Sequence, residues 1–500
     1  MFMSNGKGFN ENILIVILSV ITVISIAFSI YMVIDYFTKI QATKNTKLVL
    51  YEGPKTIKPS NDTKIKVNGH DVFVYDATVN NTHRWVNDGK PPLSKTPMTY
   101  FDFEGKVNVE ITVSNINKIE SCSVLPTASG IKPLIKGNTV TFRIDNPGFY
   151  TVQFNNSVEG AVHIFANPIE KDIPKKGDKN VVFIGPGEWT IDDIALESGQ
   201  TLYISGGAVV HTTVHGTLLN NVTIRGRGIV DGSIWDSWTQ KGEIARVPIN
   251  VMNSKNVNIE GIILLNPNAW ALNLFECDDV KVDNVKIITA RPNGDGITIQ
   301  SSRDIYVSNS FVRSWDDSLV VKNYAGNSNN ITFDNIQVWT DLAQSCEIGY
   351  ETNKGKQPNS TISNITFKNI TVLYNFHKPV ISIHNSDDAL VENITYQNIV
   401  VENAQMGSGD AGDNNQLIDF AILPSQWSST HERGNIRAVT VENVKVLRGN
   451  FPPSRIVGYD ENHTIENVKI KNLLILGKKI NSLDEGKFKT NQFAKNISIE

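Results

Sequence analysis

The chain has 500 residues, with 51 acidic and 47 basic side chains and a net charge near −4. This balance does not provide the basic face that nucleic acid requires, so no nucleic-acid partner is expected. The cysteines, Cys122, Cys277 and Cys346, are too few and too scattered for a disulfide framework or a zinc site. We expect them to be small buried apolar residues, with Cys346 of further interest because it lies near the site proposed below.

After an N-terminal tail of residues 1–12, the segment Ile13–Ile34 is apolar and uncharged over 22 residues. That length is sufficient for a helix to cross a bilayer. The apolar run is longer than a usual signal-peptide core and has no Ala-x-Ala-like end, which favours a membrane signal-anchor over a cleaved signal peptide. Lysines after the segment weakly favour a cytoplasmic location for the large domain that follows it. The chemistry of the downstream region outweighs them, so we expect a membrane-anchored extracellular catalytic domain, or a secreted one.

Residues 48–166 alternate apolar and polar positions, as in the strand that contains Val107, Val109 and Ile111. This period of two is typical of strands with one buried face, and Asn68-Gly69 is a hairpin signal. We therefore predict a small antiparallel β-sandwich. The functional alternative is a carbohydrate-binding module that uses Trp85, Tyr100 and Phe101. The polar, proline-containing stretch 167–180 is predicted to be a linker.

From residue 181 to residue 500 the chain repeats a unit of two short strands joined at an Asn or Gly corner. Equivalent aliphatic residues recur at Val257, Val280, Ile305 and Ile331, with spacings of 23 to 26 residues. A period of 20 to 30 residues without a helical pattern indicates a solenoid. The prediction is a right-handed parallel β-helix, with asparagine corners because Asn tolerates left-handed backbone. The complete expectation is an all-β chain behind an N-terminal transmembrane helix.

Two turns in this region carry carboxylates and lead directly into apolar strands. Asp295 lies in the turn 291–296, and Asp316 and Asp317 lie in the turn 314–318, so that Asp316 follows Asp295 by 21 positions. At that period the turns would stack on neighbouring coils, about 4.8 Å apart. Acetal hydrolysis with inversion requires two carboxyl groups roughly 6.5–9.5 Å apart, and crowding of like charges keeps one of them protonated. Most such Asp pairs are merely solvated corners, but the repeat spacing favours a catalytic site here.

The Asn293-Gly-Asp-Gly296 and Trp315-Asp-Asp317 segments resemble the motifs of polygalacturonase-like enzymes, glycoside hydrolase family 28. The leading sandwich also resembles the layout of the dextranase and isopullulanase branch, family 49. Both resemblances imply an inverting hydrolase without a metal or other cofactor. They further imply that Asp316 is the general acid, that Asp295 and Asp317 are the bases that activate water, and that Asn293 binds substrate.

The chain departs from the polygalacturonase pattern at two places. The stretch 343–351 has no histidine where those enzymes have Gly-His-Gly, and 380–384 lacks their Arg-Ile-Lys segment. An Arg and Lys pair is suited to grip a uronate carboxylate, so recognition of galacturonate is in doubt. Lys322, Glu347 and His384 are the predicted substrate-binding residues. Further candidates for substrate contact are Arg313, Glu351, Arg433, Arg437, Trp270, Trp315 and Trp339.

The predicted function is an inverting glycoside hydrolase that acts on a polysaccharide or oligosaccharide. A dextranase- or isopullulanase-type hydrolase of α-glucans is one alternative. A polysaccharide lyase, which would use calcium and an arginine base, is another. A non-catalytic β-helix adhesin is the third.

Overall fold

The computed structural model describes residues 46–80, 93–238, 244–405 and 416–500. Within these ranges the regular structure is almost wholly β, with the single short 3-10 turn η1 at Thr127–Ser129. The predicted membrane segment Ile13–Ile34 and Trp85 lie outside the described residues. In the described part of the chain, no helix is long and apolar enough to cross a membrane.

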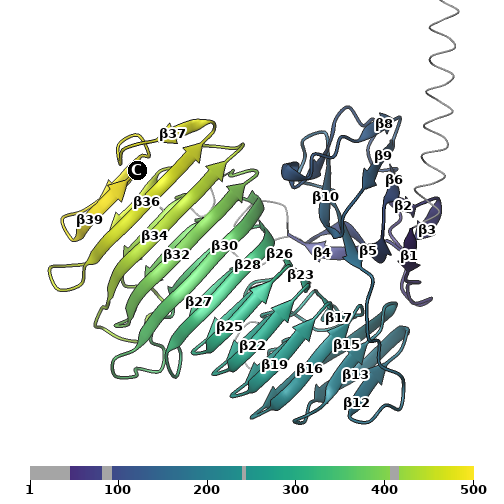
Figure 1. The fold of residues 1–500 in the computed structure, drawn as a ribbon, viewed down its shortest axis with the longest axis horizontal. Helices are drawn as coiled ribbons and strands as arrows, with labels where there is room; N and C mark the ends of the chain where they lie inside the picture. The colour runs from purple at the N-terminus through teal and green to yellow at the C-terminus, as the bar shows by residue number, and fades with distance from the viewer. Residues whose placement is uncertain (1–45, 81–92, 239–243, 406–415) are drawn as a thin grey trace, which may run out of the picture.

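Two sheets face each other between residues 47 and 168, as the predicted sandwich requires (Figure 1). Side chains from both sheets, such as Val109 and Val152, share one core. The Asn68-Gly69 hairpin is present, with positive φ at both residues and antiparallel strands on either side. One pairing differs from the antiparallel prediction, because β5 and β11 run parallel. The strands are β1 (Lys47–Leu50), β4 (Tyr75–Val79), β5 (Ser94–Glu104), β7 (Cys122–Leu125), β10 (Gly148–Phe154) and β11 (Val162–Pro168) in one sheet, and β2 (Thr63–Val67), β3 (His70–Val72), β6 (Val107–Val113), β8 (Leu134–Lys136) and β9 (Thr139–Ile144) in the other.

The remaining strands coil into a parallel β-helix with three columns of paired strands. The first column contains β12 (Val181–Ile184), β14 (Thr201–Ile204), β16 (Asn220–Gly226), β19 (Lys255–Glu260), β22 (Asp278–Asp283), β25 (Arg303–Ser308), β28 (Ser328–Thr340), β30 (Thr361–Asn375), β32 (Leu390–Val401), β34 (Asn435–Val446), β36 (Ile465–Ile475) and β39 (Ala494–Ile499). The second contains β13 (Gly187–Ala195), β15 (Ala208–Thr217), β17 (Ile229–Asp231), β20 (Ile263–Leu265), β23 (Lys286–Ile288) and β26 (Phe311–Ser314), and continues in the second halves of β28 to β36. The third begins with the second halves of β13 and β15. It continues with β18 (Ile249–Met252), β21 (Leu272–Phe275), β24 (Ile297–Gln300), β27 (Leu319–Lys322), β29 (Cys346–Tyr350), β31 (Ile381–Asn385), β33 (Ile418–Ile422), β35 (Ser454–Val457) and β38 (Phe488–Thr490). Near the C-terminus β37 (Lys478–Ile480) folds back antiparallel on β36.

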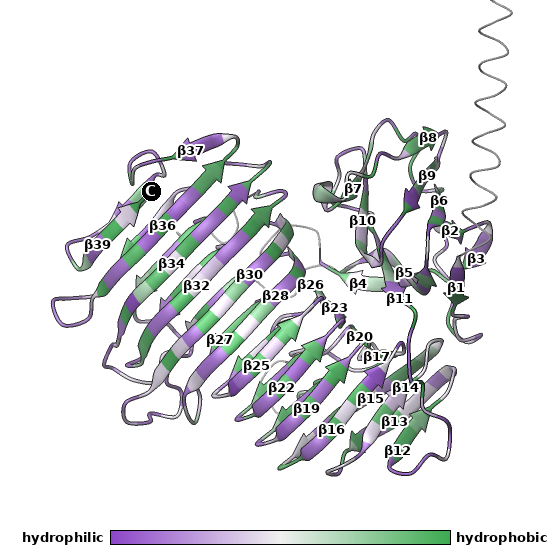
Figure 2. Cartoon of the chain, viewed as in Figure 1, coloured by the Kyte–Doolittle hydropathy of each residue, from purple (hydrophilic) through white to green (hydrophobic). Residues whose placement is uncertain are grey.

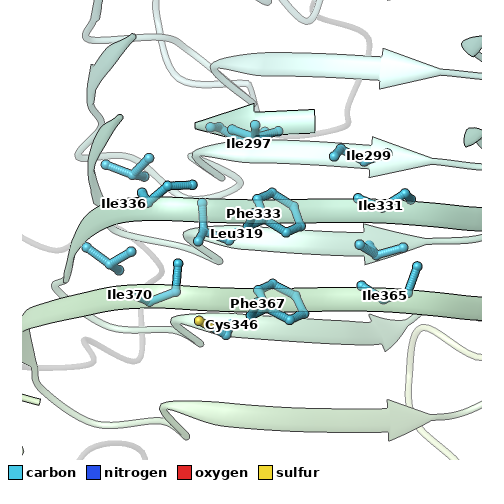
Figure 3. Close-up of a cluster of buried hydrophobic side chains, with 14 of the residues drawn as sticks. Ile297, Ile299, Leu319, Ile331, Phe333, Ile336, Cys346, Ile365, Phe367 and Ile370 are labelled. Carbon is cyan, nitrogen blue, oxygen red and sulfur yellow. The ribbon is translucent and has the colours of Figure 1, made fainter. Parts of the chain in front are cut away.

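The register of the first column follows the predicted repeat. Val257 pairs with Val280, Val280 with Ile305, and Ile305 with Ile331. Side chains that face inward stack on their equivalents from coil to coil, and Figure 3 shows this for the residues around Phe333 and Phe367, whose rings stack 4.8 Å apart. Cys346 occupies one of these inward positions and is fully buried, so it belongs to the core. The right-handed sense of the coil stays a prediction, which the preference for right-handed crossovers supports.

The sandwich packs on the outer face of the second column of the β-helix. A second apolar cluster joins sandwich residues such as Tyr100 and Phe165 to the outward side chains of Ile288, Phe311 and Trp339. Apolar side chains therefore lie on both faces of the second-column strands. Along the other strands, hydrophobic and hydrophilic residues alternate (Figure 2). Strands buried on both faces are expected to be apolar throughout.

Buried ion pairs and hydrogen bonds join the sandwich to the β-helix. The Arg227 guanidinium lies 3.1 Å from the Asp102 carboxylate, across the interface. Arg313 is fully buried, pairs with Asp341 at 2.9 Å and donates to the ring of His163 at 3.2 Å. Buried charged contacts of this kind are specific in geometry and fix how the two parts meet.

Candidate active site

The two carboxylate-bearing turns lie side by side, at the junction between the second and third columns. Asn293 and Gly296 in one turn donate backbone N–H groups to the Asp316 carboxylate at 3.2 Å and to the Asp317 carbonyl at 2.8 Å. In return, the N–H of Asp316 lies 3.4 Å from the carbonyl of Gly294. The adjoining strands pair Ile297 with Leu319. Asp295 and Asp317 therefore occupy equivalent positions on neighbouring coils.

This register also extends to the coils on either side. The third-column strands pair Leu272 with Ile297 and Leu319 with Cys346. The residues two positions before these strands therefore form one row across four coils. The row consists of Trp270, Asp295, Asp317 and Gln344. Neighbouring strands lie about 4.8 Å apart, so the two carboxylates have an aromatic ring on one side and an amide on the other.

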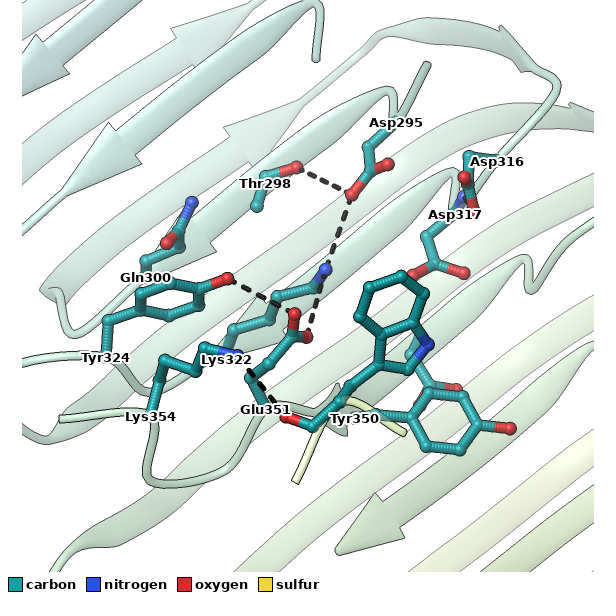
Figure 4. A network of polar contacts seen from close by, with 12 residues as sticks. Asp295, Thr298, Gln300, Asp316, Asp317, Lys322, Tyr324, Tyr350, Glu351 and Lys354 are labelled. Atoms are coloured by element: carbon teal, nitrogen blue, oxygen red, sulfur yellow. Dashed lines mark hydrogen bonds and ion pairs between the residues drawn. The ribbon is translucent and has the colours of Figure 1, made fainter. Parts of the chain in front are cut away.

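A cleft of about 310 Å³ opens over this row. Figure 4 shows the carboxylates of Asp295, Asp316 and Asp317 together with the polar residues around them. Trp238 and Trp270 lie against each other at one end of the cleft, with ring centroids 5.0 Å apart. The cleft is lined by Trp238, Trp270, Asn293, Asp295, Trp315, Asp316, Asp317, Lys322, Tyr324, Leu342, Gln344, Tyr350, Glu351, Lys354, Lys378, Gln426 and Trp427.

Lys322 is the buried cation of this site. Its Nζ lies 3.5 Å from Asp295 and 3.3 Å from Glu351, and Tyr324 donates its hydroxyl to Glu351 at 3.2 Å (Figure 4). Burial opposes the charge of Lys322, but the two carboxylates raise its pKa well above the ordinary value. Burial likewise opposes the charge of Glu351, whose pKa is nevertheless lowered because Lys322 is so close. Lys322 therefore stays protonated, and the carboxylates of Asp295 and Glu351 balance its positive charge.

Burial dominates the ionisation of the two carboxyl groups in the row. It raises the pKa of Asp295 to about 7, against the opposing charge of Lys322. It also raises the pKa of Asp317 well above the ordinary value, and the nearby carboxylates of Asp316 and Asp295 add to the shift. Asp316 is half-buried and accepts two backbone N–H groups, from Asn293 and Asp317, each at 3.2 Å. At mildly acidic pH the carboxyl groups of Asp295 and Asp317 therefore retain a proton, and either of them can act as a base only after it has lost that proton.

Glu347 and His384 do not line the cleft, and their predicted contact with substrate is revised. Both side chains are fully buried, and His384 lies between the carboxylates of Glu347 at 2.8 Å and Asp419 at 3.0 Å. Arg455 continues the chain of charges with an ion pair to Asp419 at 2.7 Å. The ring of His384 stacks on Tyr350, which does line the cleft, with centroids 4.3 Å apart. His384 therefore supports the wall of the cleft through its contact with Tyr350.

The other candidates divide between the cleft and the scaffold. Trp270, Trp315 and Glu351 line the cleft, whereas Trp339 and Arg313 are buried under the sandwich. Arg433 binds backbone carbonyls and Arg437 pairs with Glu392, and neither contributes to the cleft. The lining residues that sequence reasoning missed are Trp238, Tyr324, Leu342, Gln344, Tyr350, Lys354, Lys378, Gln426 and Trp427. Gln344 could have been found, because it lies two positions before the apolar strand that begins at Cys346, as Asp317 lies two positions before the strand that begins at Leu319.

Among the residues that the structure describes, no group of three or more His, Cys, Asp or Glu side chains is arranged to hold a metal ion.

The chain is similar to known proteins both in sequence and in fold. A family model described as "Glycosyl hydrolases family 28" matches residues 173–482. An exopolygalacturonase of Arabidopsis thaliana, clone GBGE184, is 24% identical over 267 residues, which are 49% of this chain and 59% of that protein. A probable endopolygalacturonase D of Aspergillus niger is 24% identical over 321 residues, 59% of each chain. The chain thus spans a little over half the length of these relatives.

The fold over most of the chain is also similar to that of a solved structure. Dex49A from Penicillium minioluteum matches with a TM-score of 0.62 and 15% identity, and the match covers 90% of this chain and 96% of that one. At this identity the likeness shows the fold alone.

Proposed function

Because this chain belongs to glycosyl hydrolase family 28 and is a polygalacturonase-like glycoside hydrolase, we propose that its cleft cleaves a polysaccharide or oligosaccharide with inversion. The observation that carries this proposal is the meeting of Asp295, Asp316 and Asp317, from neighbouring coils, in one cleft. Inverting enzymes require one carboxylic acid to protonate the leaving oxygen and one carboxylate to activate a water on the opposite face of the sugar.

In the proposed reaction Asp316 donates its proton to the glycosidic oxygen. Either Asp295 or Asp317 accepts one proton from the attacking water. The water oxygen bonds to the anomeric carbon while the bond from that carbon to the glycosidic oxygen breaks in the same step. Asn293 and Lys322 orient the substrate beside these groups. The tryptophans of the cleft, such as Trp270, offer flat apolar faces with a polar N–H, which suit the mixed surface of a sugar ring.

The raised pKa values give a test of these roles. If Asp295 acts as a base, it must be ionised, so kcat/KM should increase as the pH rises through about 7. Measuring kcat/KM from pH 4 to pH 9 checks this. A rate that instead falls as the pH rises through about 7 would assign the proton donor to Asp295 and contradict the proposed roles.

Lys322→Met should shift that pH dependence. The lysine charge lowers the pKa of Asp295, so its removal should move the acidic limb of the profile to higher pH. The matched control is Lys354→Met, because Lys354 also lines the cleft but is exposed and bonds only weakly, at 3.5 Å, to the Trp427 carbonyl. The proposed coupling requires a shift in the first variant and none in the second.

A neutral α-glucan is a second candidate substrate, and one observation favours it. The strand 380–384, which stands where polygalacturonases carry Arg-Ile-Lys, contains Ser382 and His384, both buried and both bonded to Glu347. The buried cation of the cleft, Lys322, is already paired with two carboxylates. Neither the strand 380–384 nor Lys322 therefore offers an unpaired cation to a uronate carboxylate. The other lysines of the cleft are Lys354 and Lys378.

The substrate proposal is tested by incubating the full chain with polygalacturonate, xylogalacturonan, dextran and pullulan. Release of reducing ends from at least one of them is the expected result. Binding without any release would support the adhesin alternative, and activity lost on calcium chelation would support the lyase.

Export of the catalytic region is also part of the proposal. The segment Ile13–Ile34, an apolar run of 22 residues, supports anchoring in a membrane with the catalytic region outside the cell. Digestion of the catalytic region by protease on intact cells is the expected result, and protection from protease would contradict it.

A further inference from the structure

The ammonium group of Lys322 is shared between two carboxylates that come from different coils (Figure 4). Its Nζ lies 3.5 Å from Asp295, in the turn before β24, and 3.3 Å from Glu351, which directly follows β29. The strand that ends at Lys322, β27, pairs with β24 on one side and with β29 on the other. The three side chains therefore come from three successive coils, with the lysine in the middle.

Glu351 is held in this place by contacts that do not involve the three aspartates. One of its carboxylate oxygens accepts the Tyr324 hydroxyl at 3.2 Å, while the other faces Lys322. The Tyr324 ring is fixed in turn by an edge contact with Phe275, with centroids 6.2 Å apart. The Glu351 carbonyl accepts the backbone N–H of Asn323 at 3.0 Å. The carboxylate is thus oriented before any substrate binds.

Glu351 is ionised over the pH range in which Asp295 titrates. Although burial opposes its charge, Lys322 lowers the pKa of Glu351. Burial raises the pKa of Asp295 to about 7, Lys322 lowers it, and Glu351 raises it. The positive charge of the lysine therefore serves two carboxylates at once, and one of them also repels the other. The remaining titratable groups around Asp295 are Asp316, Asp317 and Tyr324.

We propose that Glu351 is a positioning residue for the reaction, which, with Tyr324, holds part of the Lys322 charge away from Asp295 and so keeps Asp295 basic enough to take a proton from water. The inference rests on the proposed function, in which Asp295 can serve as the base. A carboxylate that faces an undivided positive charge is a weak base, and sharing that charge makes it a stronger one. No bond forms or breaks at Glu351 in the proposed reaction.

Glu351→Gln should therefore move the pH dependence in the direction opposite to Lys322→Met. The amide keeps the size of the side chain and can still accept the Tyr324 hydroxyl, but it leaves the whole lysine charge to Asp295. The acidic limb of kcat/KM should move to lower pH by roughly one pH unit. The rate on the plateau should fall, because a less basic carboxylate takes up the proton less readily.

A titration without substrate tests the same claim at the carboxyl group itself. The aspartate carboxyl carbons of the full chain are labelled with carbon-13, and the NMR signal of Asp295 is assigned by its absence from Asp295→Asn. Between pH 4 and pH 9 this signal should titrate with a midpoint near 7 in the parent chain. In Glu351→Gln the midpoint should be lower by roughly one pH unit.

Glu392→Gln is the matched control, because Glu392 also pairs with a basic residue, Arg437 at 2.7 Å, but lies outside the cleft. It should leave the midpoint of Asp295 unchanged. A second variant, Glu351→Asp, keeps the negative charge but draws the carboxylate back by one carbon, and covers the case in which Glu351→Gln does not fold. Its midpoint should also lie below that of the parent.

An unchanged or raised midpoint of Asp295 in the Glu351 variants overturns the inference. A lowered midpoint without a matching move of the acidic limb of kcat/KM overturns it as well, because Asp295 would then not be the base that limits the reaction. The titration reports on Glu351 whether or not any polysaccharide is cleaved. Failure of this inference can therefore be told from failure of the proposed function, which the release of reducing ends decides.

Discussion

Replacing Asp316 with asparagine is expected to reduce the rate of glycosidic cleavage by about 10²- to 10⁴-fold, the usual effect of losing a general acid. The amide keeps the size of the carboxyl group but has no acidic proton to give to the leaving oxygen. Asp316 is half-buried and has no ion pair among the described contacts, so the midpoint of thermal unfolding should change little. Release of reducing ends and the thermal midpoint are the two measurements.

Asp279→Asn is the matched control. Asp279 is an exposed corner residue with φ of 54°, a left-handed conformation that asparagine also tolerates. This variant should keep full activity. Equal activity in the Asp316 and Asp279 variants would remove Asp316 from the reaction.

Replacing His384 with methionine should destabilise the folded protein by about 3–5 kcal/mol, the usual cost of breaking a buried ion pair. The imidazolium lies between Glu347 and Asp419, and its loss leaves the Glu347 carboxylate buried, with Ser382 as its remaining side-chain partner among the described residues. The ring contact with Tyr350 is lost as well. Chemical or thermal unfolding of the variant and the parent measures the effect.

The stabilisation should also depend on pH. Although burial opposes its charge, the carboxylates of Glu347 and Asp419 raise the pKa of His384 from 6.5 to about 10. A raised pKa means that the folded state binds the proton more tightly than the unfolded state. The contribution of His384 is therefore complete below pH 6.5 and is lost as the pH rises toward 10. The difference between parent and variant should shrink over that range.

The control for this prediction is His215→Met. His215 also pairs with a carboxylate, Asp193 at 2.9 Å, but both side chains are largely exposed, so the pair should add little to stability. Similar losses of stability in the two variants would show that burial of the ion pairs of His384 with Glu347 and Asp419 is not what stabilises the fold.

The local features of the fold could be predicted from the sequence. Strand repeats and corner asparagines are encoded within a few residues, so the equivalence of Val257, Val280 and Ile305 was correct. The same spacing brought Asp295 next to Asp317, because one coil is one repeat long. Contacts between distant segments left no such pattern. Nothing near Arg313 in the sequence indicates that it would be buried against His163, 150 residues away.

The substrate-binding predictions divide for the same reason. Lys322 lies at the end of a strand whose turn carries Asp316 and Asp317, so its place in the cleft follows from the repeat. Glu347 and His384 also occupy outward positions of the third column, but they satisfy each other's charge and are buried there. Outward direction on a strand does not reveal whether another part of the chain covers it. Trp427 enters the cleft from the long connection between β33 and β34, and no repeat spacing predicts its position.

The stereochemistry of the product tests the central claim most directly. A substrate from the polysaccharide panel is hydrolysed inside an NMR spectrometer, and the anomeric signal of the first-formed reducing end is recorded before mutarotation. A single displacement by water predicts a new hemiacetal of the configuration opposite to that of the bond that was cleaved. A first product of unchanged configuration, or an unsaturated sugar, would contradict the account.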